Sequence, residues 1–428
     1  MIIDTSKIIK IDKIEPNKIA RISKTGNKIA RIILWGKVNI FNCWILIKKN
    51  IAIVIKIPKI ILCTIKIVKI SKFIKVFLLF LEMKEKELKE IRKILEESEN
   101  PLYFYDDDTD GLCSYLLLKK KYEKGKGICV KGSPVLDEKF VRKVNEIMPD
   151  KVIILDMPIV TQDFIDKVNV PIIWIDHHEI QEREGVKIYN PRKWDKEDNR
   201  PTAYWCYRIV EENLWIGMIG TVGDWYLPKE YLGKFRKDHG LLKEDVKEPG
   251  EALFNTEFGK LVRIFNFVLK ESVTNVKNVV SVLLKIEDPF DILEGKTSKG
   301  RFVYKMYEKI NKGYDELLEK ALDEIKDEKV IVFIYSAKKT TFTGDLGNEL
   351  LYKFPDRLII IGRVKEDRVM FSLRSGKYKV SPLVKKAVSK VEGHGGGHLY
   401  SCGANIAKED YVKFIEEIKK GVKWILTV

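Results

Sequence analysis

The chain has 428 residues, enough for two or three domains with a sizeable core. Its net charge of +16 is uneven, because residues 1–82 carry 17 basic and 4 acidic residues, a net of +13, while residues 83–428 carry 61 basic and 58 acidic residues, a net of +3. The six cysteines show no Cys-x-x-Cys spacing, which argues against a zinc site or a disulfide framework. The basic total therefore says little about what the folded body binds, and a cytoplasmic location is the default.

Residues 1–82 have an unusual composition, with 24 Ile and 15 Lys in strings that show no helical period. Both residue types use A/T-rich codons, so the segment is what an A/T-rich stretch upstream of a gene would encode. We predict that the true start is Met83 and that residues 1–82 are not part of the fold. The alternatives are a membrane anchor and a basic arm. Lysine interrupts every apolar run before the roughly 18–20 residues that a spanning helix needs, and no signal-peptide cleavage site is present, so we expect no membrane contact.

The first part of the body alternates between helical and strand patterns. Residues 84–95 predict an amphipathic helix. Apolar runs predict strands at residues 102–105, 152–155 and 172–175, and helical patterns follow at residues 112–122, 137–147, 163–168 and from 201 onward. This alternation predicts an α/β class fold with a doubly wound parallel sheet, whose ligand site lies at the carboxyl ends of the strands.

The second part of the body predicts a helical connection and then a smaller α/β domain. Helical patterns dominate residues 251–328. Strands are predicted at residues 330–335, 358–363 and 369–372, and helices at residues 345–354, 381–388 and 408–421. We therefore expect a first domain at residues 83–250, a helical linker region at residues 251–328 and a second domain at residues 329–428.

Acidic residues gather where predicted strands end. Asp106, Asp108 and Asp110 follow the first strand at alternate positions, so an extended segment would point them to one side. Asp156 follows the second strand, and Asp224 follows a glycine-containing segment. Carboxylate oxygens suit Mg²⁺ or Mn²⁺, and buried like charges are costly unless cations hold them together. The alternative is an acidic turn in water, since Asp is common in turns.

The triplet Asp176-His177-His178 closes the third predicted strand and is the stronger signal. The chain has only five histidines, and four of them lie in two short motifs, so chance is a poor explanation. The alternative is one core and one exposed histidine, because adjacent side chains of a strand point in opposite directions. Together the four clusters predict a two-metal hydrolase.

These motifs occur in the order known from one family. The segment Asp106–Gly111, the lone Asp156, the triplet at 176–178 and Asp224 resemble the four motifs of the DHH phosphoesterase family. Because the first motif opens with Asp106 and not with His, the likeness is to the RecJ-like nuclease branch, and the compact architecture is similar to archaeal RecJ-like proteins. The later run, with Ser372-x-Arg374 and Gly393 to His398, resembles the DHHA1 domain that accompanies this catalytic domain.

The resemblance implies two divalent cations, and manganese is favoured over magnesium because a histidine is among the ligands. It places these residues at the two cations: Asp106, Asp108 and Asp156 at one, and Asp110, Asp156, His177 and Asp224 at the other. It further implies that His178 contacts the scissile phosphate and that Asp176 orients the histidine pair without binding a metal itself. The two cations would lower the pKa of an attacking water.

For the second domain the resemblance implies a grip on the substrate. The glycines Gly395, Gly396 and Gly397 would leave backbone N–H groups free to line an anion without obstruction by Cβ atoms. Arg374 offers a planar fork to phosphate, with Ser372 and His398 as further donors. The alternatives are an ordinary glycine turn and a solvated arginine.

We therefore predict a metal-dependent phosphodiesterase, namely a RecJ-like 5′ to 3′ exonuclease on single-stranded DNA or RNA, with a place in DNA repair. The family resemblance adds the GINS complex of the replication machinery as a partner. The alternatives are a phosphodiesterase for short oligoribonucleotides or cyclic dinucleotides, and a non-catalytic scaffold, against which the full set of motif acids argues. We see no OB-fold platform of the bacterial RecJ type, so we expect long strands to be held weakly or by a partner.

Overall fold

The computed structural model describes residues 85–132, 134–337 and 340–427. The predicted leader at residues 1–82 and the predicted start at Met83 lie outside the described residues. The chain divides into two compact units, Met1–Lys86 and Glu87–Val428, and the second contains nearly all that is described. Across the described part of the chain, no helix is long and apolar enough to cross a membrane.

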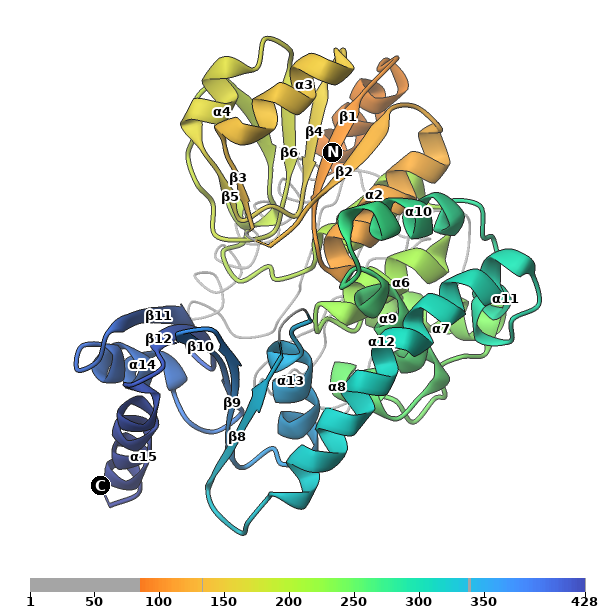
Figure 1. Ribbon diagram of the computed structural model, residues 1–428. Helices are drawn as coiled ribbons and strands as arrows, with labels where there is room; N and C mark the ends of the chain where they lie inside the picture. The colour runs from red at the N-terminus through yellow and green to blue at the C-terminus, as the bar shows by residue number, and fades with distance from the viewer. Residues whose placement is uncertain (1–84, 133, 338–339, 428) are drawn as a thin grey trace, which may run out of the picture. The chain divides into compact units, whose positions relative to one another are not determined.

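The first half of the larger unit is built around a parallel sheet with strand order β2-β1-β4-β6-β7 (Figure 1). A helix at residues 85–96 precedes the sheet and buries Leu88, Ile91 and Leu95, as its amphipathic pattern predicts. The elements that follow are β1 (Leu102–Asp106), α2 (Thr109–Tyr122), β2 (Lys126–Val130), β3 (Val135–Leu136), η2 (Glu138–Phe140), α3 (Val141–Ile147), β4 (Val152–Leu155), β5 (Ile159–Val160), α4 (Gln162–Lys167), β6 (Ile172–Ile175), β7 (Val186–Tyr189), η3 (Pro191–Lys193), α5 (Thr202–Val210), α6 (Leu214–Gly223) and α7 (Lys229–His239).

Both faces of this sheet are buried, which explains why its strands are continuous apolar runs without alternation. In β1, Tyr103 and Tyr105 face the core that α2, α5 and α6 share. Leu102 and Phe104 face the opposite core, against α3 and α4. Helices therefore cover the sheet on both sides, and the predicted doubly wound α/β fold is confirmed (Figure 1).

The order of the strands sets where a ligand can bind. The chain leaves β1 for β2 on one side and then crosses to β4, β6 and β7 on the other side. The direction of winding thus reverses between β1 and β4, and in open α/β sheets the loops at such a reversal part to form a crevice for ligands. Asp106 and Asp156 lie at this point.

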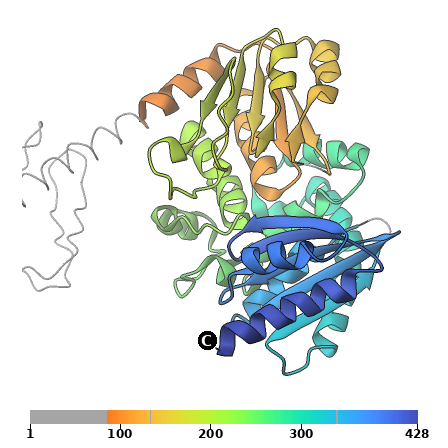
Figure 2. The ribbon, with the colours of Figure 1, turned by 90° about the vertical axis from the view of Figure 1, so that its left-hand side faces the viewer.

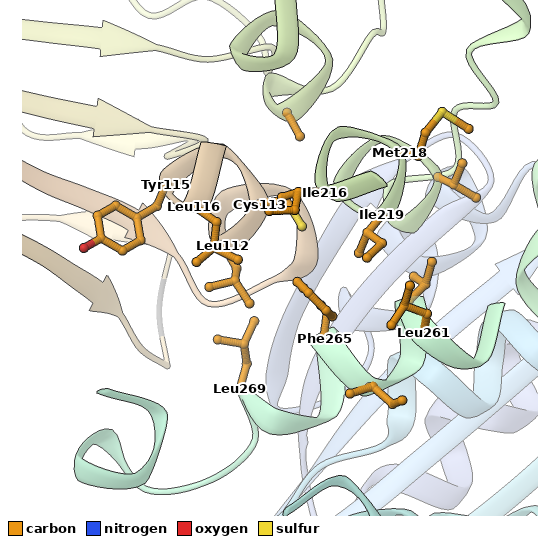
Figure 3. Packing of buried hydrophobic residues seen from close by; sticks show 14 of the residues in the cluster. Leu112, Cys113, Tyr115, Leu116, Ile216, Met218, Ile219, Leu261, Phe265 and Leu269 are labelled. Carbon is orange, nitrogen blue, oxygen red and sulfur yellow. The ribbon is translucent and has the colours of Figure 1, made fainter. Parts of the chain in front are cut away.

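A helical region follows, and it packs on the same core. Its helices are α8 (Pro249–Phe254), α9 (Glu257–Val268), α10 (Val273–Leu283), α11 (Pro289–Leu293) and α12 (Ser298–Asp323). Leu112 and Leu116 of α2 meet Ile219 of α6 and Phe265 of α9 in one buried cluster (Figure 3). This cluster fixes α2, the helix that carries part of the acidic motif, against its neighbours.

The second half forms a smaller mixed sheet with strand order β11-β12-β10-β9-β8. Its elements are β8 (Val330–Ser336), α13 (Thr343–Lys353), β9 (Leu358–Lys365), β10 (Arg368–Ser375), α14 (Val380–Val388), β11 (Gly393–His398), β12 (Ser401–Ala407) and α15 (Tyr411–Thr427). Only β8 and β9 pair in parallel in this sheet. Helix α13 packs on one face, whereas α14 and α15 belong to the core of the other face (Figure 2). The predicted smaller α/β domain is confirmed.

One alternative for this sheet is excluded. Residues 393–398 form the edge strand β11, paired antiparallel with β12, and not an ordinary glycine turn. Gly395 is needed for close approach, because a Cβ atom there would lie 2.9 Å from both Ala404 Cβ and the Gly403 carbonyl oxygen. Alternate N–H groups of an edge strand still point away from the sheet, so an anion can reach them.

We expect Gly220→Ala to destabilise the protein by about 1–3 kcal/mol, the usual cost of overpacking a core. A Cβ atom on Gly220 of α6 would lie 2.5 Å from Ala203 Cβ and 2.7 Å from Cys113 Cβ. The matched control is Gly313→Ala in α12, where nothing lies within 4 Å, and helix propensity alone should stabilise it by up to about 1 kcal/mol. Urea unfolding measures both variants, and equal effects would contradict this account of the packing.

Candidate metal centre

The first acidic motif is a strand end that turns directly into a helix. Asp106 is the last residue of β1, Asp108 is the N-cap of α2, and Asp110 lies in the first turn. The Asp108 carboxylate accepts a hydrogen bond from the Gly111 N–H at 2.9 Å. The prediction of one extended segment is therefore wrong, because the side-chain cap starts the helix at Thr109, three residues before the predicted start. Helical turning, not strand alternation, sets the directions of Asp108 and Asp110.

Asp110 is held by the N-terminus of another helix. Its two carboxylate oxygens accept hydrogen bonds from the N–H groups of Thr202, at 2.8 Å, and Ala203, at 2.6 Å. These N–H groups belong to the first turn of α5, where they have no acceptor within the helix, and the helix dipole there favours negative charge. The Thr202 hydroxyl also donates to Asp156 Oδ1 at 3.2 Å. Sequence reasoning missed Thr202; the available signal was a hydroxyl residue at a predicted helix start.

Asp156 is the central acid of the cluster. It is 1% exposed and has a left-handed backbone with φ of 58°. Its N–H donates to the Ile175 carbonyl at 3.0 Å, which ties the end of β4 to the end of β6. Non-glycine residues adopt this backbone at a cost of about 1–3 kcal/mol and tend to do so at functional sites.

His177 lies among three of these acids. Its Nε2 atom is 3.4 Å from Asp156 Oδ1, 3.5 Å from Asp224 Oδ2 and 3.8 Å from Asp110 Oδ2. The donor atoms of Asp110, His177 and Asp224 all lie within 4.8 Å of one another. These residues come from the first turn of α2, the loop after β6 and the end of α6. Tertiary structure therefore brings together three residues that are far apart in sequence.

The two histidines do not point in opposite directions, because β6 ends at Ile175 and strand geometry does not continue into the triplet. Their ring centroids are 4.5 Å apart. His178 Nδ1 donates to Asp176 Oδ1 at 2.8 Å, since a carboxylate can only accept. Asp176 Oδ2 accepts from the His178 N–H at 2.9 Å and from Asn190 at 3.3 Å. Asp176 thus fixes the ring of His178 and leaves its Nε2 atom for another partner.

Repulsion and burial dominate the electrostatics of the acids. Burial, with Asp108 nearby, raises the pKa of Asp106 to about 8 and that of Asp224 to about 7. Burial and neighbouring carboxylates also raise the pKa values of Asp110 and Asp156 well above the usual range. Such a cluster takes up either protons or cations, because its charges cannot all remain unbalanced.

The histidines are tuned in opposite directions. Burial, followed by the charges of His178 and Arg192, lowers the pKa of His177 to about 3, so its ring is neutral and able to ligate a metal. Burial also lowers the pKa of His178, but the hydrogen bond and charge of Asp176 outweigh it and raise the pKa overall. The two rings are therefore suited to different tasks.

The donor set fits a divalent cation. It combines carboxylate oxygens with one neutral imidazole, which suits Mn²⁺ or Mg²⁺ better than a soft metal. A second set of three close donors comprises Asp156, His177 and His178. We favour the set with Asp110 and Asp224, because the His178 atom near Asp156, at 3.9 Å, is the Nδ1 that already donates to Asp176. Among the described residues, neither Asp106 nor Asp108 belongs to such a close set, although the side chain of Asp108 is close enough to that of Asp156 to share a proton with it.

Four of the predicted substrate residues of the smaller sheet lie at positions of one face, namely Ser372, Arg374, Gly396 and His398. Strand register puts Ser372 opposite Gly403, which pairs with Gly396, and puts Arg374 opposite Ser401, which pairs with His398. Ser372 is buried, and its hydroxyl has no hydrogen-bond partner in the described structure. His398 is exposed at the end of β11 and is close enough to His177 for its charge to act on that ring. Of these residues, His398 thus acts on the metal centre, and Ser372 has an unused hydroxyl donor.

Family models match both halves of the chain. A model of the DHH family N-terminal domain matches residues 102–222, and a model of the DHHA1 domain matches residues 327–423. The chain belongs to the DHH family. As a chain with a DHH domain, it is a phosphodiester hydrolase.

Solved structures share this fold at low sequence identity. A DHH-domain protein described as a member of a family of ribosomal proteins is 16% identical with a TM-score of 0.58, covering 81% of this chain and 92% of that chain. RecJ from Thermus thermophilus in complex with Mn²⁺ is 15% identical with a TM-score of 0.55, covering 78% and 54%. An exonuclease RecJ bound to manganese is 14% identical with a TM-score of 0.52, covering 77% and 93%. A search of curated protein sequences finds no match.

We expect the metal-free DHH protein to lose stability as the pH rises from about 4 to about 8. The pKa values of Asp106 and Asp224 are raised from 3.8 to about 8 and about 7 on folding, so the folded state binds more protons than the unfolded state. The free energy of unfolding therefore falls as the pH passes through these values. Mn²⁺ or Mg²⁺ should restore it by substituting for the protons.

Urea unfolding in chelator and in excess cation, at several pH values in this range, measures the effect. Asp156→Ala should reduce the gain from cations, because it removes a central ligand. A stability in chelator that does not change with pH would contradict the picture of repelling carboxylates.

Proposed function

We propose that this protein is a metal-dependent exonuclease that removes nucleotides from the 5′ end of single-stranded DNA or RNA. The observation that carries the proposal is the convergence of Asp110, Asp156, His177 and Asp224 at one end of the parallel sheet, beside a histidine fixed by Asp176. A phosphodiester needs an electrophilic centre to bind it and a positive group to receive the developing charge, and this arrangement can provide both.

We assign the ligands of two cations as the family resemblance does. Asp106, Asp108 and Asp156 would hold one, and Asp110, Asp156, His177 and Asp224 would hold the other. When bound, the two cations supply Lewis acidity and lower the pKa of an attacking water. We favour manganese because an imidazole is among the ligands. Two RecJ structures solved with manganese support a divalent cation at this site.

The chain's own residues prepare the site for this chemistry. The α5 N-terminus and Thr202 hold Asp110 and Asp156 in place, so the ligands need little reorganisation. Asp176 keeps a proton on His178 Nδ1 and raises the pKa of the ring. His178 Nε2 can then donate to a phosphoryl oxygen and neutralise charge that grows there.

The smaller domain would hold the terminal phosphate. The Arg374 guanidinium contacts only neutral acceptors, namely Asn348 Oδ1 at 3.0 Å and the carbonyls of Leu373 at 3.0 Å and Cys402 at 3.2 Å. No ion pair neutralises it within the described ranges, and burial lowers its pKa. An anionic ligand would balance this charge. Ser372, His398 and those N–H groups among Gly395, Gly396 and Gly397 that point away from β12 offer further donors.

The proposal includes a division of labour along the chain. Residues 83–250 form the catalytic domain, residues 251–328 the helical linker region, and residues 329–428 the substrate-binding domain. Contact with the GINS complex, a role in DNA repair and a cytoplasmic location rest on family resemblance or composition and stay predictions.

We expect the full chain with Mn²⁺ to release mononucleotides from 5′-labelled single strands of graded lengths, and Asp156→Ala to lower the rate by at least about 10³-fold, because it removes a shared ligand. The matched control is Asp238→Ala, an exposed acid on α7, which should keep wild-type activity. Gel or mass analysis of the products reads out both.

The dependence of cleavage on strand length decides between the alternative functions. Cleavage confined to dinucleotides and very short oligomers would move the protein to the small-nucleotide phosphodiesterases. No cleavage of any strand with Mn²⁺ or Mg²⁺ would make the replication scaffold the better account.

We expect Arg374→Ala to lower kcat/KM on 5′-phosphorylated strands by about 10- to 100-fold, the value of a charge-assisted hydrogen bond, and to leave 5′-hydroxyl strands nearly unchanged. Arg368→Ala is the control, because Arg368 lies on the same strand but is already bonded to Asn405 and Glu392. Equal losses on both kinds of strand would contradict a role in binding the terminal phosphate.

A further inference from the structure

Arg192 lies beside the metal centre. It is neither a proposed metal ligand nor one of the residues proposed to bind the terminal phosphate. It belongs to η3, the short helix after β7, and β7 pairs with β6, the strand that ends at the histidine triplet. Its N–H donates to Asn190 Oδ1 at 3.0 Å. The amide of Asn190 in turn donates to Asp176 Oδ2 and, at 3.0 Å, to the His178 carbonyl. One asparagine therefore fixes both the backbone of Arg192 and the triplet.

The guanidinium of Arg192 has unmet bonding capacity. The side chain is half-buried, and its Nε atom is buried without a hydrogen-bond partner in the described part of the chain. No carboxylate of the described residues pairs with it. Neighbouring arginines differ, since Arg200 Nε donates to Asp198 at 2.8 Å and Arg183 Nε donates to the Val160 carbonyl at 2.8 Å. A buried, unpaired N–H costs about 1–3 kcal/mol, so this one calls for a ligand.

The positive charge of Arg192 acts on His177. It is the third cause, after burial and the charge of His178, that lowers the pKa of His177. A positive side chain this near a cation-binding cluster is repelled once cations are bound, unless an anion lies between them. The anion that the site is built to receive is a phosphodiester.

We propose that Arg192 contacts a non-bridging oxygen of the scissile phosphate and stabilises the transition state, an inference that rests on the proposed function. A water oxygen forms a bond to phosphorus, and the bond from phosphorus to the leaving sugar oxygen breaks. The water loses a proton and the leaving oxygen gains one, so Arg192 neither takes nor gives a proton. The phosphoryl oxygens carry more negative charge in the transition state than in the diester, so a fixed guanidinium binds the transition state more tightly.

The test uses the full chain loaded with Mn²⁺ and the substrate bis(4-nitrophenyl) phosphate, which has no base, sugar or terminal phosphate. Arg192→Ala should lower kcat by about 10²- to 10³-fold, the usual loss when one charge-stabilising donor is removed, and Arg192→Lys should fall between this variant and the wild type. Added guanidinium ion should restore part of the activity of Arg192→Ala alone. Lys193→Ala is the control, because the exposed Lys193 bonds only to the Ile188 carbonyl among its described contacts.

Two binding measurements by calorimetry separate the possible failures. Mn²⁺ affinity should be unchanged in Arg192→Ala, while the affinity of the Mn²⁺-loaded protein for inorganic phosphate should fall about tenfold or more, as for a lost charged hydrogen bond. Activity within about threefold of wild type, or lost Mn²⁺ binding, would overturn the inference. If the wild type hydrolyses neither the diester nor any strand, the proposed function fails, and phosphate binding still decides whether Arg192 contacts the anion.

Discussion

Mutual repulsion of buried carboxylates is the constraint on which the rest of the site depends. Asp110 and Asp156 are each 1% exposed, and Asp224 and His177 lie within a few ångströms of them. Such a cluster persists only where the scaffold offers compensation. The dipole of α5 and the hydroxyl of Thr202 supply part of it, and cations would supply the remainder. The fold therefore carries a strained, charged crevice that is ready for metal.

The architecture explains how one crevice collects these groups. Strands β4 and β6 both end at it, and α2 starts from it after β1. Helix α6, which ends at Asp224, packs against α2 and α5 at Gly220, where only a glycine allows the approach. This contact serves both stability and function, because the helices that bury the core also carry the acids and their hydrogen-bond donors.

Fewer positively charged side chains than acidic side chains surround the crevice. His178 is fixed by Asp176, Arg192 is anchored through Asn190, and Arg374 lies in the smaller sheet with neutral acceptors only. The body of the protein is nearly neutral in total charge. Affinity for an anionic substrate would therefore come from a few placed groups and from metal, not from a general basic surface.

Sequence reasoning succeeded where apolar periodicity or a short motif carries the information. The buried strands around residues 102, 152 and 172, and the acids that follow them, are local features, because a run of apolar residues must be buried wherever it lies. The strands β2, β3, β5, β7, β11 and β12 were missed. Charged, polar or glycine residues interrupt the apolar runs of β2, β7 and β12, while β3 and β5 are only two residues long and the glycine-rich β11 has no strand pattern.

The sequence by itself determined the α/β class, the family and the residues with metal-binding chemistry. Only the tertiary structure decided which of them meet. Hydrogen bonds from Thr202 and Ala203 to Asp110, and from Asn190 to Asp176, join segments that are 92, 93 and 14 residues apart. Arg192 likewise comes close to the histidine triplet only because β7 pairs with β6. Contacts of this kind depend on strand order and helix packing, which are set by the burial of the whole core and leave no local pattern in the chain.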